Sequence, residues 1–203
     1  MKRFKIIDKS KNSSYLKPTK LAFITLVFCL LISAIIGIIL ILIGDFGEIE
    51  FKTLGTAATL AGFSIVSLPS LFYLERYRYQ FISKFGFISC TFFFSLILLL
   101  IWVGEPVGED IFFKVTATFG IFSFSTNHIL LILIAKPVTK FILISQRLTT
   151  IAISILALLL LLAIWTIEDM PGFLARITAA ISIIVALGTI AVPILTRINT
   201  KNI

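Results

Sequence analysis

Long apolar blocks alternate with short polar segments along the whole chain. Each block is close to the roughly 20 residues that a helix, rising about 1.5 Å per residue, needs to cross a hydrocarbon core about 30 Å thick. None alternates polar and apolar positions, as a membrane-spanning strand would. The pattern predicts an all-α, polytopic membrane protein with six transmembrane helices, at Leu21–Ile43, Thr53–Leu74, Phe85–Val103, Ile111–Ala135, Leu148–Ile167 and Phe173–Leu195.

The composition agrees with this fold class. Of the 203 residues, 59% are hydrophobic and 14% are charged, and the mean hydropathy is +1.10. Soluble domains carry roughly 25% charged residues. We divide the chain into a basic cytoplasmic tail (1–20), a six-helix transmembrane domain (21–196) and a cytoplasmic C-terminus (197–203). No soluble domain fits outside the helices, so binding is expected within the membrane or at its faces.

Basic residues are concentrated in alternate connections between the predicted helices. They are abundant in the N-terminal tail, in the second and fourth connections and at the C-terminus, whereas acids dominate the other three connections. Basic residues near helix ends stay on the cytoplasmic side. We therefore expect a multi-pass protein of a plasma (inner) membrane, bacterial in origin, with both termini in the cytoplasm. The net charge of +8 then indicates contact with anionic lipid rather than nucleic acid.

Three similar hairpins follow one another along the chain. Each has a very apolar outgoing helix, an acidic outer turn and a more polar returning helix. One basic residue near the start of each returning helix recurs at intervals of 62 residues: Lys52, Lys114 and Arg176. The repeat predicts three tandem two-helix units with approximate threefold symmetry, the returning helices lining the centre. The units span about 21–74, 85–135 and 148–195.

Small residues recur on the returning helices at a spacing that puts them on one face. Gly55 and Gly62 are seven residues apart, and Ala179 and Ala186 repeat that spacing two periods later. Small residues allow helix backbones to approach closely in lipid. We predict that both pairs are packing seams rather than ligand sites.

Lys52, Lys114 and Arg176 are the first candidate binding residues, because they break the charge rule that orients the helices. Two interpretations remain open. Nearby acids in each outer turn can pair with them; the candidates are Glu48, Glu50, Glu109, Asp110, Glu168 and Asp169. Alternatively, the three cations form a ring around the symmetry axis and attract an anion or a lipid phosphate.

Asn127 and His128 are the second candidate, since they form the most polar pair inside any predicted helix. Ionisable residues within a transmembrane segment are candidates for function. A lone neutral histidine whose ring is satisfied by neighbouring hydroxyl groups is the structural alternative. With a single histidine in the chain, neither a histidine-rich metal site nor a bis-histidine haem is expected.

The sequence contains no motif of a known catalytic site, and we expect no enzyme activity, no cofactor and no metal. Our first hypothesis is a non-catalytic membrane subunit, an accessory or scaffold protein that packs with itself or within a membrane protein complex. The alternative is a small transporter or channel for an anion or small polar solute, its path lined by the returning helices.

Overall fold

The computed structural model describes residues 18–43, 47–77, 79–104, 108–135, 139–166 and 171–200. All six elements are helices, and each is long and apolar enough to cross a membrane. This confirms the all-α fold with six candidate spans. The helices are α1 (Pro18–Ile43), α2 (Glu48–Glu75), α3 (Gln80–Val103), α4 (Glu109–Ile134), α5 (Lys140–Trp165) and α6 (Gly172–Thr200).

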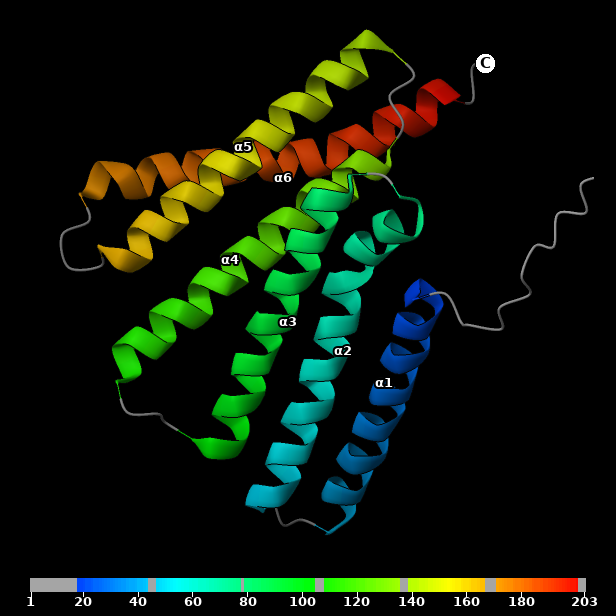
Figure 1. Cartoon of the computed structure of the whole chain (residues 1–203), viewed down its shortest axis with the longest axis vertical. Coiled ribbons are helices and arrows are strands. Elements are labelled where there is room, and N and C mark those ends of the chain that lie inside the picture. The colour runs from blue at the N-terminus through cyan, green and yellow to red at the C-terminus, as the bar shows by residue number, and fades with distance from the viewer. Residues whose placement is uncertain are drawn as a thin grey trace, which may run out of the picture.

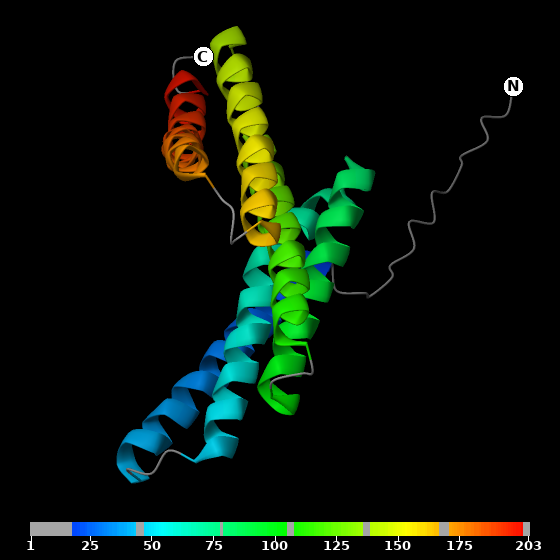
Figure 2. The same cartoon turned by 90° about the vertical axis from the view of Figure 1, so that its left-hand side faces the viewer.

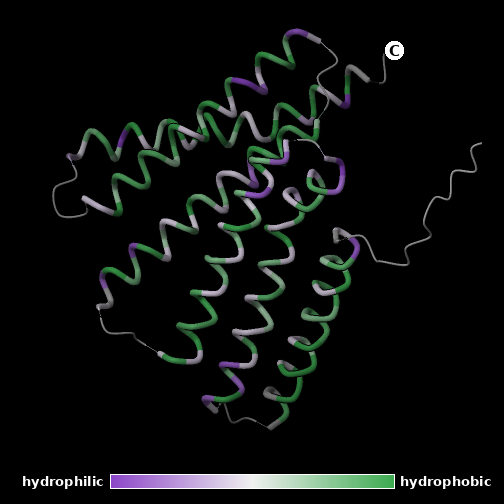
Figure 3. The backbone as a smooth tube through the Cα atoms, viewed as in Figure 1, coloured by the Kyte–Doolittle hydropathy of each residue, from purple (hydrophilic) through white to green (hydrophobic). Residues whose placement is uncertain are grey.

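Several helices extend beyond the apolar blocks from which they were predicted. α2 begins at Glu48 rather than Thr53, and α5 begins at Lys140 rather than Leu148. Figure 3 shows hydrophilic positions in the first turns of both helices and mostly hydrophobic positions after them. A helix satisfies its own backbone bonds in water as well as in lipid, so hydropathy marks the membrane boundary and not the helix end. Of the predicted tails, residues 1–17 and 201–203 lie outside the described residues.

Glycine and threonine mark two of the turns between helices. Gly104 ends α3 and Gly108 precedes α4, both with positive φ angles of 83° and 87° that L-residues with a side chain rarely adopt. At the start of α5, the Thr139 hydroxyl accepts a hydrogen bond from the backbone N–H of Ile142.

The helices form an open fan rather than a closed bundle (Figures 1 and 2). Each helix packs against the next along the chain, and α4 also contacts α2 and, over a short stretch, α6. α2 and α6 do not touch, so the described helices do not show the predicted threefold arrangement around the returning helices. Lipid supplies no hydrophobic force that would close such a fan, so its shape depends on local helix contacts.

The most closely packed part of the fold lies between α2, α3 and α4. α2 carries the largest buried share of the six helices. A Cβ atom placed on Gly62 would lie 3.0 Å from the Phe94 ring, and one on Gly86 would lie 2.9 Å from the Thr126 methyl group. In the second half of the chain, Gly188 of α6 faces Thr149 of α5 in the same way. Small residues therefore set the helix separations on which the candidate site depends.

Candidate functional site

Asn127 lies at the centre of a buried hydrogen-bond cluster that joins three helices. Its side chain is 4% exposed, and its Oδ1 accepts from the Ser70 hydroxyl at 2.6 Å and from the Ser70 backbone N–H at 3.3 Å. Its Nδ2 donates to the carbonyl oxygens of Ser123 at 2.9 Å and Gly86 at 3.5 Å. Both polar atoms of the amide are thus engaged, and Asn127 links α2, α3 and α4 rather than offering groups to a ligand.

The cluster sits next to a proline inside α2. Pro69 has no backbone N–H, and its ring disturbs the hydrogen bonding of the preceding turn. Transmembrane helices tolerate proline where neighbouring helices satisfy the disturbed backbone groups. Asn127 provides one such contact from α4, by accepting the N–H of Ser70, the residue after the proline.

His128 adjoins this cluster but faces another helix. Its Nε2 lies 2.8 Å from the Thr189 hydroxyl of α6. That hydroxyl donates its own hydrogen to the Val185 carbonyl at 2.7 Å, so towards the histidine it acts as acceptor. The network therefore assigns the proton of the neutral ring to Nε2. Nδ1 is left as an acceptor with no hydrogen-bond partner among the described residues.

An open cavity of about 450 Å³ lies beside the histidine and is lined by residues of α2, α4, α5 and α6. Its walls are mostly aliphatic and aromatic, with Ser125, Asn127 and His128 as their polar members. The apolar lining residues are Ile65, Val66, Pro69, Phe124, Leu131, Ile153, Leu156, Leu160 and Val185. Because the Asn127 amide is engaged in the cluster, His128 and the Ser125 hydroxyl are the hydrogen-bonding groups that the cavity offers.

The three outer cations are not brought into a ring. They lie in the second turns of α2, α4 and α6, and Figure 1 shows the N-terminal ends of these helices spaced along one side of the fan. Lys52 forms the predicted ion pair, with its Nζ 2.6 Å from Glu48 one turn earlier. The Glu48 side chain is 81% exposed, so water screens the pair and it contributes little to stability. The acids Glu168 and Asp169 and the side chain of Glu109 lie outside the described residues.

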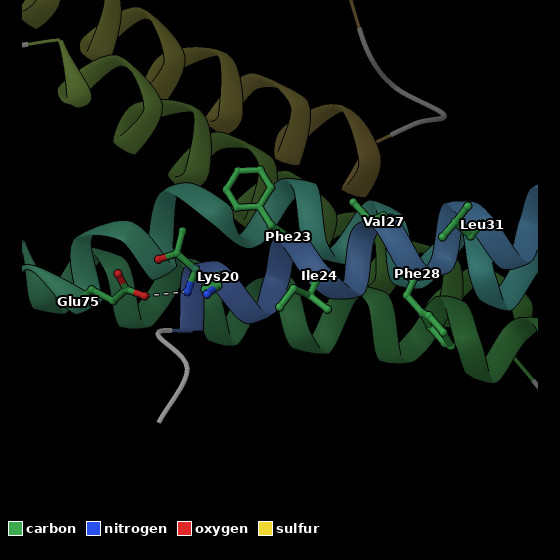
Figure 4. Close-up of a pocket in the computed structure, with 8 residues that line it drawn as sticks. Lys20, Phe23, Ile24, Val27, Phe28, Leu31 and Glu75 are labelled. Atoms are coloured by element: carbon green, nitrogen blue, oxygen red, sulfur yellow. Dashed lines mark hydrogen bonds between the residues drawn. The ribbon is translucent and has the colours of Figure 1, made fainter. Parts of the chain in front are cut away.

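Two polar contacts at the predicted cytoplasmic end were not anticipated from the sequence. Gln146 of α5 is buried and donates through Nε2 to the carbonyl oxygens of Ile132 and Ala135, at the C-terminal end of α4. Glu75 of α2 accepts the backbone N–H of Thr19, in the first turn of α1, at 2.7 Å (Figure 4). Both side chains satisfy helix-end backbone groups, which the sequence pattern alone does not locate.

An open groove of about 600 Å³ runs along α1 from this capping contact (Figure 4). Phe23, Val27 and Leu31 lie along it, and Lys20 and Glu75 lie at its polar end. The apolar side chains of α1 are about half exposed there, as expected for a surface that faces lipid.

Comparison with family models, with curated proteins and with solved structures finds no match for this chain. Among the described residues, no group of three or more His, Cys, Asp or Glu side chains could hold a metal ion. Cys29 and Cys90 are both buried and unpaired with each other. The absence of a catalytic, metal or cofactor site remains a prediction.

Proposed function

We propose that the protein is a non-catalytic membrane subunit that docks a transmembrane helix of another polypeptide, or of a second copy, against α6. The proposal rests on a comparison of two helix faces that carry small residues, Gly55 and Gly62 on α2 and Ala179 and Ala186 on α6. A Cβ atom on Gly55 would lie 3.3 Å from Ile101, and one on Gly62 would lie 3.0 Å from Phe94. This face of α2 is therefore covered by α3.

The corresponding face of α6 is not covered by any of the described helices. Ala179 and Ala186 lie 124 residues, two predicted periods, after Gly55 and Gly62, and both are exposed. Among the described helices, α6 packs against α5 and touches α4 over a short stretch. Small exposed residues on one face are poor lipid contacts but good helix contacts, because they let a second backbone approach. In the first unit, α3 covers the equivalent face of α2. This supports a partner helix that packs in the same way on the Ala179–Ala186 face of α6.

Affinity purification in mild detergent, followed by mass spectrometry, tests the proposal. We expect a partner, or a second copy, in stoichiometric amount with the wild-type protein. The double variant Ala179→Leu, Ala186→Leu should lose it, since the added side chains block close approach. Ile184→Phe is the matched control, because residue 184 is exposed on nearly the opposite side of α6. Recovery of the wild type as a solitary monomer would contradict the proposal.

We propose further that both termini face the cytoplasm of a bacterial inner membrane, with anionic lipid against the basic side. The distribution of basic residues supports this orientation. Single cysteines at Gly172 and Arg197, in a background without Cys29 and Cys90, test it with a thiol reagent that does not cross membranes. In intact cells, position 172 should react and position 197 should not. Reaction at position 197 but not at position 172 would show that both termini face the opposite side of the membrane.

A small transporter or channel is the second candidate, and the cavity between α2, α4, α5 and α6 is the observation that favours it. Two features weigh against an anion as the solute: the walls are mostly apolar, and neutral His128 presents an acceptor at Nδ1. Flux of chloride, phosphate and small polar metabolites into liposomes tests this candidate. Flux that disappears in His128→Phe would favour transport over the subunit role.

A further inference from the structure

The cavity beside His128 has a chemical character more specific than its apolar walls. Asn127 is engaged through both atoms of its amide, with Ser70 on one side and with Ser123 and Gly86 on the other. The histidine is tied through Nε2 to Thr189. With the ring proton on Nε2, the nitrogen that remains, Nδ1, accepts a hydrogen bond and does not donate one. The other polar group of the lining is the Ser125 hydroxyl.

The depth of the site also limits what can enter it. His128 precedes the end of α4, Ile134, by six residues, or about 9 Å along the helix axis. This places it within the hydrocarbon region, near one membrane face. The volume of about 450 Å³ falls in the range of roughly 300–1,000 Å³ that small-molecule sites occupy. A fully polar solute would leave most of these walls without a partner.

We propose that this cavity binds a membrane-soluble molecule with an apolar body and a hydroxyl group, a long-chain alcohol or a phenol, whose O–H donates to Nδ1 of His128. The aliphatic walls from α2, α5 and α6 cover the apolar body. Thr189 is a positioning residue, because it holds the Nε2 proton and thereby keeps Nδ1 free to accept. This ligand class does not depend on the subunit role or on transport.

Photolabelling with a matched pair of probes tests the inference. The first probe is hexadecanol with a diazirine in its chain, and the second is its methyl ether, which lacks the hydroxyl hydrogen. With wild-type protein in detergent, we expect the alcohol to label cavity-lining residues of α4 between 124 and 131. The ether should need about two- to tenfold more probe for half-maximal labelling, the change expected from one neutral hydrogen bond.

Two variants separate binding at His128 from simple partitioning onto the lipid-facing surface. His128→Phe keeps an aromatic ring but removes the acceptor, so both probes should label it equally. Thr189→Val should reduce the preference for the alcohol without abolishing it, since either ring nitrogen can then carry the proton. Equal labelling of wild type by both probes, or labelling confined to the α1 groove, would overturn the inference. So would an alcohol preference that persists in His128→Phe.

Discussion

Trp102 of α3 donates its indole N–H to the hydroxyl of Thr56 on α2, at 3.0 Å. The Thr56 hydroxyl in turn donates to the Lys52 carbonyl at 2.8 Å. The same arrangement recurs in the next unit, where Trp165 donates to a threonine hydroxyl that is bonded to the Lys114 carbonyl. The two threonines are 62 residues apart and the two tryptophans 63. This recurrence supports the predicted repeat, which remains a prediction.

Trp102→Phe should destabilise the packing of α2 against α3 by about 0.6 kcal/mol, a typical value for a side-chain hydrogen bond between transmembrane helices. Thr56→Val should cost a similar amount. A double-mutant cycle, measured by unfolding in detergent, should show that the two losses are not additive. Ala180→Thr is the control, because Ala180 occupies the equivalent place in α6 and the two tryptophans of the sequence pair with threonines of α2 and α4. Additive losses would mean that the bond contributes nothing.

Asn127→Ala should destabilise the fold by about 1–3 kcal/mol, because it removes the acceptor of the buried Ser70 hydroxyl and of the Ser70 backbone N–H. Pro69→Ala should reduce that loss, since it supplies the missing N–H and lets α2 straighten. Stability in a graded denaturing detergent measures both effects. Ser182→Ala provides a control, because that hydroxyl is exposed and bonds within its own helix. An unchanged midpoint for Asn127→Ala would show that the cluster does not hold α2 to α4.

Gly86→Ala should cost about 1–3 kcal/mol, the usual range for overpacking a close contact. The added methyl group would lie 2.7 Å from the Ser70 hydroxyl and 2.9 Å from the Thr126 methyl group. Gly37→Ala is the matched control, since nothing lies within 4 Å of a Cβ atom there. The midpoint of unfolding in a graded denaturing detergent should be clearly lower for Gly86→Ala than for Gly37→Ala. If Gly86→Ala behaves like Gly37→Ala, then α2, α3 and α4 do not pack as closely as described.

Glu75→Ala should loosen the first turn of α1, which loses the carboxylate that accepts the Thr19 N–H. A negative charge at a helix N-terminus contributes about 0.3–1 kcal/mol. Hydrogen–deuterium exchange should quicken in the first turn of α1 and stay unchanged in α4. Glu75→Gln keeps an acceptor without the charge and should give an intermediate rate. Equal exchange in the wild type and Glu75→Ala would show that the contact does not cap the helix.

The candidate site was only partly predictable from the sequence. Asn127 and His128 stand out because both are polar inside an apolar helix, and one nitrogen of the histidine ring does meet a neighbouring hydroxyl group, that of Thr189. The partner of Asn127 was not identified. Ser70 lies 57 residues away, and transmembrane helices carry many serines, so nothing in the sequence distinguishes the one that faces it.

The sequence by itself determined the number and nature of the helices, because the length of an apolar run must match the thickness of the membrane whatever its neighbours do. It also located Gly55 and Gly62, at which α2 and α3 approach closely, but not Gly86 or Gly188. Only the tertiary structure decided which helices meet. Their crossing directions, which leave Ala179 and Ala186 exposed and keep α2 from α6, depend on contacts between residues far apart in the chain. In lipid these contacts come from shape and hydrogen bonding, which a hydropathy pattern does not encode.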